Sequence, residues 1–418
     1  MDFSESDDLA AHREAARAWA DAHVRPEWAA EQRRSGCHQT MDLHALLARD
    51  GILGAGWPAE YGGSSVDPGF ARAVFDELTP RGLLSDGWAT TLMVAHTISH
   101  VGTEEQKCEY LPAALRGEMV IALGYSEPDS GSDVASAKTT AVRGADSASA
   151  GWVINGQKMF TSTAQVASHV FVLARTNADA PKHQGLTLFL VPTASPGFEL
   201  RPIHTLGGQV TNATFYSDVQ VPDSARIGGV DAGWPVMKVA LVYERGVGGA
   251  ASLEQTVSRD LAAWARGARR PDGSAVFDDP LVLERIGRIA VDEAVLGVLD
   301  AQMRWLAGKG QLPQVEGSMR KLFWSESAQR HYSDALDILG AEGVLAPDAP
   351  GALGALGAPV AGRLEQGFRA AVVTTVYGGA SEILREIIAE RRLGLPRNRP
   401  GSGGPRPVAL GQSGEDGV

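Results

Sequence analysis

Apolar positions recur at helical spacing through the first part of the chain. One amphipathic helix is predicted from Asp7 to about Val24, because apolar residues three to four positions apart share a helix face. Thr103 followed by Gln106 has the pattern of a capping box, which opens a helix. Three more helices are predicted over the ranges 41–48, 67–78 and 86–100. We therefore expect residues 1–118 to form an N-terminal helical domain.

The pattern changes at Gly117, where the apolar period shortens towards two. Short runs of β-branched and aromatic residues fill the range Met119–Val221, and such runs are typical of strands. Asn155-Gly156 lies between two of these runs and predicts a hairpin turn. Because no helical crossover separates the runs, residues 119–228 are predicted to form a central antiparallel β domain, a sandwich or a barrel.

Helical spacing returns after Asp231. The long helical segments predicted there are 233–266, 280–306, 317–339 and 362–393, with a flexible Gly-, Ala- and Pro-rich loop over 346–359. We expect residues 229–397 to form a C-terminal helical domain. Residues 398–418 are rich in Gly, Pro and Ser and predict a disordered tail. The fold class that follows is α+β.

Composition limits the partners and the compartment. The 418 residues carry a net charge of −12, which argues against a nucleic-acid-binding or anionic-membrane surface. The acidic N-terminus resembles neither a secretory signal nor a transit peptide, and no apolar run approaches the roughly 18 residues that a membrane span needs. Two cysteines without CxxC spacing suit a reducing cytosol. We expect a cytoplasmic protein with no nucleic-acid partner and no membrane span.

The segment Ile121–Asp133, IALGYSEPDSGSD, carries the most candidate chemistry. Its strand ends in a polar loop, in which Pro128 fixes one φ and Gly131 lets backbone N–H groups approach a ligand closely. N–H groups and hydroxyls in such a turn form a concavity suited to anionic or carbonyl-rich ligands. Taken by itself, the same composition is also typical of an ordinary surface turn.

Two later segments change that balance, WVINGQKMFTSTAQVASHVFVLART (Trp152–Thr176) and YGGASEILREIIAERRLGLPR (Tyr377–Arg397). With GWPAEYGG, EEQKCEYLPAALRGE and LGAEG, they resemble the acyl-CoA dehydrogenase family, FAD enzymes that desaturate acyl-CoA thioesters between Cα and Cβ. The resemblance covers the chain as far as Arg397. It implies an N-terminal helical domain, a central antiparallel β domain and a C-terminal four-helix bundle. It also implies FAD at a subunit interface, a homotetramer or a heterotetramer with a related subunit, and an electron-transfer flavoprotein as electron acceptor.

The resemblance further implies which β-domain residues contact the flavin. A flavin that accepts hydride needs a hydrogen-bonded, water-poor face. The positions that match the family's contacts are Leu123, Tyr125, Ser126, Gly131, Ser132, Phe160 and Ser162. In the family, the position of Ser132 also lies near bound substrate. Judged from its strand alone, Phe160 could equally be a core aromatic.

Other contacts are implied in the C-terminal helices. Gly340 and Ala341 match positions that reach the adenosine end of FAD from the partner subunit. Ala380 and Glu382 match cofactor contacts in the region near Tyr377. Tyr377 and Arg245 are assigned to substrate binding, as is Ser132. No metal site is implied.

The catalytic base departs from the commonest family pattern. Taking a proton from the carbon α to a thioester needs a carboxylate in a dry pocket, where burial raises its proton affinity. Many members carry this Glu directly after the Tyr of the C-terminal motif, where this chain has Gly378. A second family arrangement is a Glu-Arg pair on the helix after the β domain, and Glu244-Arg245 stands there. We therefore assign the base to Glu244 and keep for Gly378 a backbone N–H donor to the thioester oxygen, as in an oxyanion hole.

The arginine that usually reaches the FAD diphosphate has no clean match. The region holds Arg266, Arg269 and Arg270, and Asp337 replaces a common Gln. Similar departures occur in a bacterial branch that pairs two different subunits and often oxidises bulky or ring-bearing CoA thioesters. The leading hypothesis is therefore FAD-dependent α,β-dehydrogenation of an acyl-CoA thioester, with bulky or branched acyl groups included.

Two alternatives stay open. The chain could be a half-site or non-catalytic subunit of a heteromeric acyl-CoA dehydrogenase, or a flavin-dependent monooxygenase or oxidase on the same fold. Such oxygen-using relatives usually lack a base at either position, so Glu244 counts against the second. His96 and His100 have a spacing that suits a metal, but without a carboxylate partner they are better explained as helix-face histidines.

Overall fold

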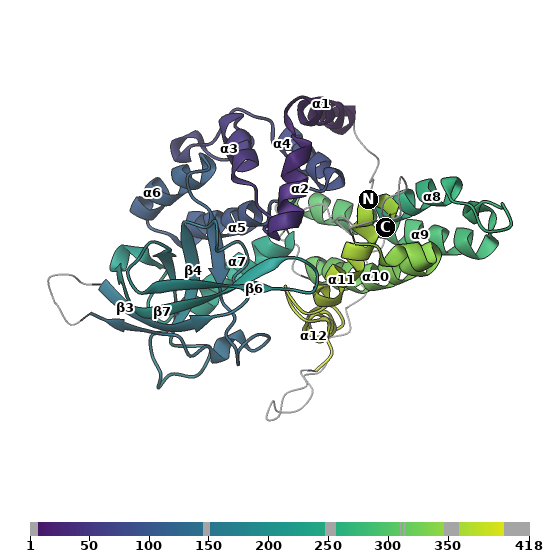
Figure 1. Cartoon of the computed structure of the whole chain (residues 1–418). Helices are drawn as coiled ribbons and strands as arrows, with labels where there is room; N and C mark the ends of the chain where they lie inside the picture. Colours follow the sequence, from purple (N-terminus) through teal and green to yellow (C-terminus); the bar gives the residue numbers. More distant parts are fainter. Residues whose placement is uncertain are drawn as a thin grey trace, which may run out of the picture.

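The predicted α+β fold is confirmed in a computed structural model that describes residues 7–144, 151–246, 256–309, 311, 315–346 and 359–396. Figure 1 shows the N-terminal helices above a sheet, with the C-terminal helices extending to one side. The predicted tail, 398–418, and residues 347–358 of the predicted flexible loop lie outside the described residues. Among the described helices, none is both long and apolar enough to cross a bilayer.

The N-terminal region is helical, as predicted. Its α-helices are α1 (Asp7–His23), α2 (Pro26–Ser35), α3 (Met41–Arg49), α4 (Pro68–Leu78), α5 (Asp86–Val101) and α6 (Glu104–Leu115). The capping box at the start of α6 is present: the Thr103 hydroxyl accepts from the backbone N–H of Gln106, and the Gln106 side chain accepts from the backbone N–H of Thr103. The amide of Gln106 also donates to the carbonyls of Ser224 and Arg226, so the start of α6 is bonded to the sheet region.

One sheet forms the centre of the molecule. Its strands are β1 (Ile121–Gly124), β2 (Thr140–Arg143), β3 (Gly151–Lys158), β4 (His169–Arg175), β5 (Leu186–Pro192), β6 (Phe198–His204), β7 (Val210–Pro222) and β8 (Arg226–Ile227). The strand order is β6-β7-β3-β2-β4-β5-β8, and β1 pairs with β4. Most pairs are antiparallel, as predicted, but β1 and β2 both run parallel to β4.

The predicted hairpin turn at Asn155-Gly156 is wrong. Both residues lie within β3, which continues past them along β7 with a shift in register. Gly156 has a φ of +143°, and a Cβ there would lie 2.6 Å from the Thr139 hydroxyl. The Asn155 side chain bonds to Asp218 on β7. The Asn-Gly pair therefore forms a bulge rather than a turn, since a glycine suits both.

Apolar side chains cover both faces of the sheet. On one face, Phe171, Leu173 and Leu188 pack with residues of α5 and α7. On the other face, Val170, Val172 and other strand residues form a separate core. This two-sided burial explains why β4 and β5 are almost continuously apolar instead of alternating.

The C-terminal helices differ from the prediction in their breaks. They are α7 (Gly233–Gly246), α8 (Val257–Gly267), α9 (Pro280–Gly308), α10 (Glu316–Leu339), α11 (Arg363–Thr374) and α12 (Ser381–Arg391). The single helix expected over 362–393 is wrong, since a turn separates α11 from α12. Gly378 and Gly379 in that turn have φ values of +62° and +98°, which glycine adopts without steric strain.

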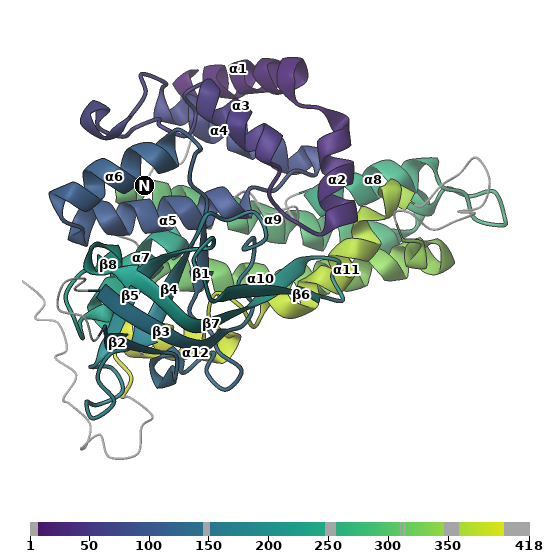
Figure 2. The same ribbon diagram turned by 60° about the vertical axis from the view of Figure 1, so that its left-hand side comes forward.

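The loop between β6 and β7 connects all three regions. Arg369 of α11 donates to the carbonyl of Leu206 in this loop, and a Cβ on Gly207 would lie 2.9 Å from the Cα of Ala370. On the N-terminal side, Val210 N–H donates to the carbonyl of Gly36. Figure 2 shows β6 running beside α11. The sheet is thus held against both helical regions at one point.

A buried histidine predicts how stability depends on pH. His44 is 1% exposed, and burial lowers its pKa to about 4. Between pH 6.5 and 4 the unfolded chain binds a proton that the folded chain does not, so the free energy of unfolding falls as the pH is lowered through this window. His44→Leu should remove on the order of 1–3 kcal/mol of that fall, measured as urea midpoints from pH 7 to 4.5. The control is His204→Leu, at an exposed histidine. An equally steep fall in the free energy of unfolding in His44→Leu would contradict this prediction.

Candidate functional site

The loop after β1 is the first part of the candidate site. Leu123, at the end of β1, and Tyr125 both pack against the core shared with α5 and α7. The ring of Tyr125 lies 6.1 Å from that of Phe171 on β4. Ser126 follows, half-buried, at the edge of this core. The sheet therefore presents three of the predicted flavin contacts, Leu123, Tyr125 and Ser126, in one short segment.

A buried ion pair fixes this segment. Lys158 is fully buried at the end of β3, and its ammonium donates to Glu127 at 2.7 Å. The Glu127 carboxylate also accepts the N–H groups of Lys138 and Thr139, at 2.6 and 2.9 Å. Burial alone would raise the pKa of Glu127, but Lys158 and these donors hold it below its ordinary value. Burial lowers the pKa of Lys158 to about 8, against the raising effect of Glu127.

The same lysine links the loop to the neighbouring strand. Its ammonium donates to the carbonyl of Tyr125 at 3.3 Å, and the N–H of the next residue, Met159, donates to the carbonyl of Ser126 at 2.9 Å. Both carbonyls therefore point towards the end of β3. This brings Tyr125 and Ser126 next to Phe160, which the sequence comparison had placed on the same ligand.

Phe160 is not a core aromatic. Its side chain is 60% exposed, and its φ is +60°, which is uncommon for a residue with a Cβ. Thr161 beside it exchanges backbone and side-chain hydrogen bonds with Asn212 on β7. The hydroxyl of Ser162 lies 3.2 Å from that of Thr211. A strained backbone that exposes a large ring next to anchored neighbours is typical of a binding surface.

Gly131 and Ser132 occupy the outer part of the loop. Both are exposed, and a Cβ on Gly131 would contact nothing within 4 Å. The carbonyl of Asp133 accepts from the Ser130 hydroxyl, and the carboxylate of Asp133 pairs with Lys182 at 2.8 Å. The loop is thus closed at both ends, with its middle open to solvent.

The α11–α12 turn forms a second cluster. Tyr377 is half-exposed, and Ala380 is the N-terminal cap of α12. Ala380 and Glu382 line a pocket of about 370 Å³. In this pocket Arg385 pairs with Glu326 of α10, at 2.7 and 2.9 Å. Glu326 and Glu382 place two carboxylates at the N-terminus of α12, and the arginine beside them is already paired. A phosphate would therefore bind less favourably here than at most helix N-termini.

Gly340 and Ala341 lie apart from this cluster within one chain. They follow the last turn of α10, while Lys321 near the start of the same helix contacts the carbonyl of Gly379. At 1.5 Å per residue, about 28 Å of helix separates Lys321 from Gly340. The pair therefore lies far from the Tyr377 cluster within one chain, and its contact with a partner subunit's cofactor stays a prediction.

Glu244 and Arg245 lie in the last turn of α7, and their side chains are outside the described part of the structure. Tyr243 before them is buried, and its hydroxyl lies 3.1 Å from Nε2 of His100. His96 stacks on Tyr243 with ring centroids 4.5 Å apart, and on Trp57 at the same separation. The two histidines noted in the sequence therefore anchor the end of α7 to α5.

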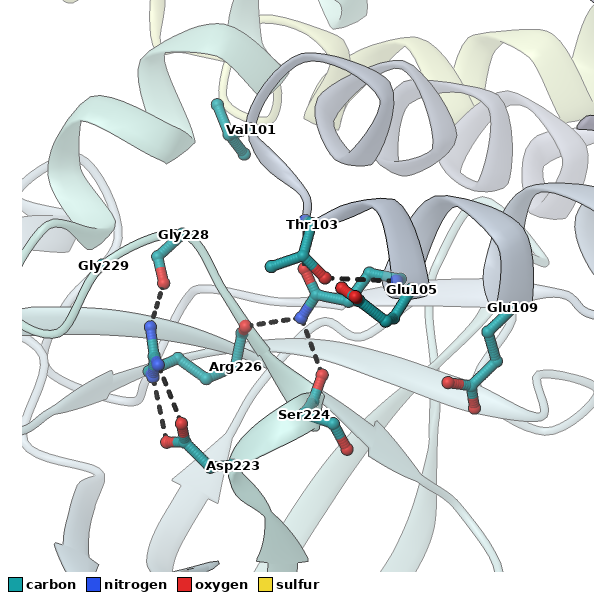
Figure 3. Close-up of a pocket in the computed structure, with 10 residues that line it drawn as sticks. Val101, Thr103, Glu105, Glu109, Asp223, Ser224, Arg226, Gly228 and Gly229 are labelled. Atoms are coloured by element: carbon teal, nitrogen blue, oxygen red, sulfur yellow. Dashed lines mark hydrogen bonds and ion pairs between the residues drawn. The ribbon is translucent and has the colours of Figure 1, made fainter.

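A separate hollow of about 380 Å³ lies at the start of α6. Figure 3 shows that Arg226 in this hollow bonds to Asp223 and to the carbonyl of Gly228. Glu105 and Glu109 line its other side. None of the predicted site residues borders it, and its arginine already has a carboxylate partner. We do not include it in the candidate site.

Two residues that shape these clusters were not predicted. Lys158 lies on the inward face of β3, with buried Trp152 and Ile154. A charged residue at an inward strand position could have indicated a buried ion pair. Lys321 lies on α10 in line with Ser325 and Gln329, a polar stripe at helical spacing that faces α11. Neither partner could be named from the sequence, because both partners are distant along the chain.

Comparison with known proteins identifies the family. The models of the acyl-CoA dehydrogenase N-terminal, middle and C-terminal domains match residues 6–118, 122–219 and 231–393. Acyl-CoA dehydrogenase FadE26 of Mycobacterium tuberculosis is 35% identical over 367 residues, which cover 84% of this chain and 87% of FadE26.

Solved structures agree with this. A chain of the ChsE4-ChsE5 complex from Mycobacterium tuberculosis has a TM-score of 0.83 and 34% identity, and the match covers 95% of this chain and all of that one. A chain of the Tcur3481-Tcur3483 steroid ACAD has a TM-score of 0.81 with the same identity and coverage. The chain therefore belongs to the acyl-CoA dehydrogenase family of flavin-dependent oxidoreductases, as its sequence motifs indicated.

Proposed function

We propose that this protein catalyses FAD-dependent α,β-dehydrogenation of an acyl-CoA thioester with a bulky, ring-bearing or branched acyl group. The observation that carries the proposal is the edge of the sheet at which Tyr125, Ser126 and Phe160 meet. An exposed aromatic ring beside fixed backbone groups suits the flat, polar-edged ring system of a flavin. When bound, the flavin supplies the acceptor for the β-hydrogen, which leaves the substrate as hydride.

The residues at the ring end of the cofactor fit FAD better than those at the diphosphate. Arg270 pairs with Asp279, Arg269 donates to backbone carbonyls, and the Arg266 guanidinium lies 4.4 Å from the centre of the Phe277 ring. Each of these arginines is thus engaged within its own chain. We assign the ring contacts to Leu123, Tyr125, Ser126, Gly131, Ser132, Phe160 and Ser162, and we assign no arginine to the diphosphate.

Glu244 is the proposed base. Its carboxylate takes the α-proton, and the electron pair of that C–H bond forms the new double bond as the β-hydrogen leaves. The last turn of α7 is held by Tyr243 against α5, which gives the base a fixed support. The N–H of Gly378 donates to the thioester oxygen and stabilises the charge that develops on it. Ser132, Arg245 and Tyr377 are the proposed substrate contacts.

The proposed substrate class and partners are inferred from the names of similar structures. One similar structure is named a steroid ACAD, and both similar structures are named as pairs of different chains. We propose a ring-bearing or branched acyl group, an electron-transfer flavoprotein as acceptor, and a homotetramer or a heterotetramer with a related subunit. Exposed apolar residues offer surface for such contacts: Val291 and Val298 on α9, Val372 on α11, and Val376 in the turn after α11.

A second candidate function is a half-site subunit that completes a partner's pocket. The similar two-chain complexes favour it. The two functions differ in what the chain does alone, because a half-site subunit would not bind and reduce flavin without its partner.

Glu244→Gln should retain FAD and thioester binding but slow substrate oxidation by about 10²–10⁴-fold, as expected when a general base is lost. Anaerobic stopped-flow reduction with 3-phenylpropanoyl-CoA measures the rate, and exchange of the substrate α-proton with D₂O reports base action directly. Glu199→Gln, at an exposed carboxylate on β6, is the matched control. Reduction of Glu244→Gln at the control's rate would contradict the assignment.

Lys158→Met should destabilise the fold by about 3–5 kcal/mol, because it leaves the Glu127 carboxylate buried without its partner. Adding Glu127→Gln removes that charge and should recover most of the loss. The double variant still lacks the donor to the Tyr125 carbonyl, so we expect it to bind FAD at least about tenfold more weakly than wild type. Thermal unfolding and fluorescence titration of the apoprotein measure the two effects. Wild-type FAD affinity in a folded double variant would show that the pair does not position the flavin loop.

A further inference from the structure

Lys321 of α10 bonds to both sides of the turn between α11 and α12. Lys321 donates to the carbonyl of Thr374, the last residue of α11, and to the carbonyl of Gly379 beyond the turn, each at 2.8 Å. Lys321 thus connects the end of α11 to the residues that lead into α12. Its two acceptors lie on either side of Tyr377 and Gly378.

The helix end explains the first of these bonds. The last carbonyls of an α-helix have no partner within the helix, and a cation there is also favoured by the helix dipole. Gln329 donates to the carbonyls of Ala371 and Val372, and Ser381 N–H donates to that of Thr375. Lys321 donates to the carbonyl of Thr374, so the hydrogen bonds of the last α11 carbonyls come chiefly from side chains of α10.

The second bond acts on the turn itself. Two successive glycines have the largest conformational freedom of any pair in the chain, so their φ values of +62° and +98° need external restraint. The bond to Gly379 supplies that restraint one residue beyond Gly378. The Tyr377 ring adds to it, since its centroid lies 5.9 Å from the Lys321 nitrogen and 6.5 Å from the Trp324 ring.

We propose that Lys321 is a positioning residue that sets the direction of the Gly378 N–H towards the thioester oxygen. The inference rests on the proposed function, which assigns that N–H to the oxyanion. Lys321 need not touch substrate or cofactor in this role. Among the described residues, the Gly378 N–H donates to no backbone carbonyl.

The test compares Lys321→Met, which keeps the aliphatic stem, with Lys321→Arg, which can still bridge two carbonyls. The matched control is Thr374→Val, which removes hydroxyl bonds to Ser325 and Ala371 at the same helix end but neither bond of Lys321. Hydrogen exchange of residues 375–380 in the holoenzyme reports on the turn. The ¹³C=O stretch of bound [1-¹³C]cinnamoyl-CoA reports on the hydrogen bond to the thioester oxygen.

We expect Lys321→Met to speed hydrogen exchange in the turn at least about tenfold. It should also lower kcat at least about tenfold with KM little changed, and reduce the shift of the carbonyl stretch of the bound thioester. Lys321→Arg should recover part of each effect, and Thr374→Val should change thermal stability alone.

Unchanged exchange in Lys321→Met would overturn the proposal, as would faster exchange with a wild-type carbonyl shift. If Lys321→Met does not fold, Lys321→Arg must still show intermediate exchange and an intermediate shift. An unshifted carbonyl in the wild type would instead refute the Gly378 donor, while the exchange data would still decide whether Lys321 holds the turn.

Discussion

The buried pair of Glu127 and Lys158 is the interaction on which the candidate flavin surface depends. Removing two charges from water costs several kcal/mol for each ion, and here the cost is offset by short bonds between the ions and by backbone groups. Glu127 holds the N–H groups that lead into β2, while Lys158 holds the carbonyl of Tyr125. The loop after β1 and the segment after β3 therefore cannot move apart without leaving a buried charge unpaired. This constraint places Ser126 beside the exposed ring of Phe160.

The second half of the site uses the same physical device on the other helical region. Lys321, like Lys158, donates to main-chain carbonyls next to a residue with a proposed ligand contact. In both places a lysine extends from a regular element into an irregular loop, which on its own would have many conformations. The rigid sheet and the long helix α10 thereby determine the shape of two loops whose sequences alone do not fix it.

The fold was largely predictable from the sequence, but the site was predictable only in part. Periodicity separated the helical and sheet regions, because burial of one face imposes it. The prediction of a turn at Asn155-Gly156 was wrong because glycine suits a bulge as well as a hairpin. The prediction of one helix over 362–393 was wrong because helical segments lie on both sides of the turn at Gly378. The exposure of Phe160 and the partners of Lys158 depend on residues far away in sequence, so no local pattern could supply them. The role of Glu244 stays a prediction.

We propose above all that this chain binds a flavin and reduces it with a bulky acyl-CoA thioester. The most direct measurement is the visible spectrum of the purified protein before and after anaerobic addition of straight-chain, branched and ring-bearing acyl-CoA thioesters. The account predicts a yellow protein whose flavin absorbance bleaches with the branched or ring-bearing thioesters. A flavin that stays oxidised with every thioester, or a chain that remains colourless when supplied with FAD, would contradict it.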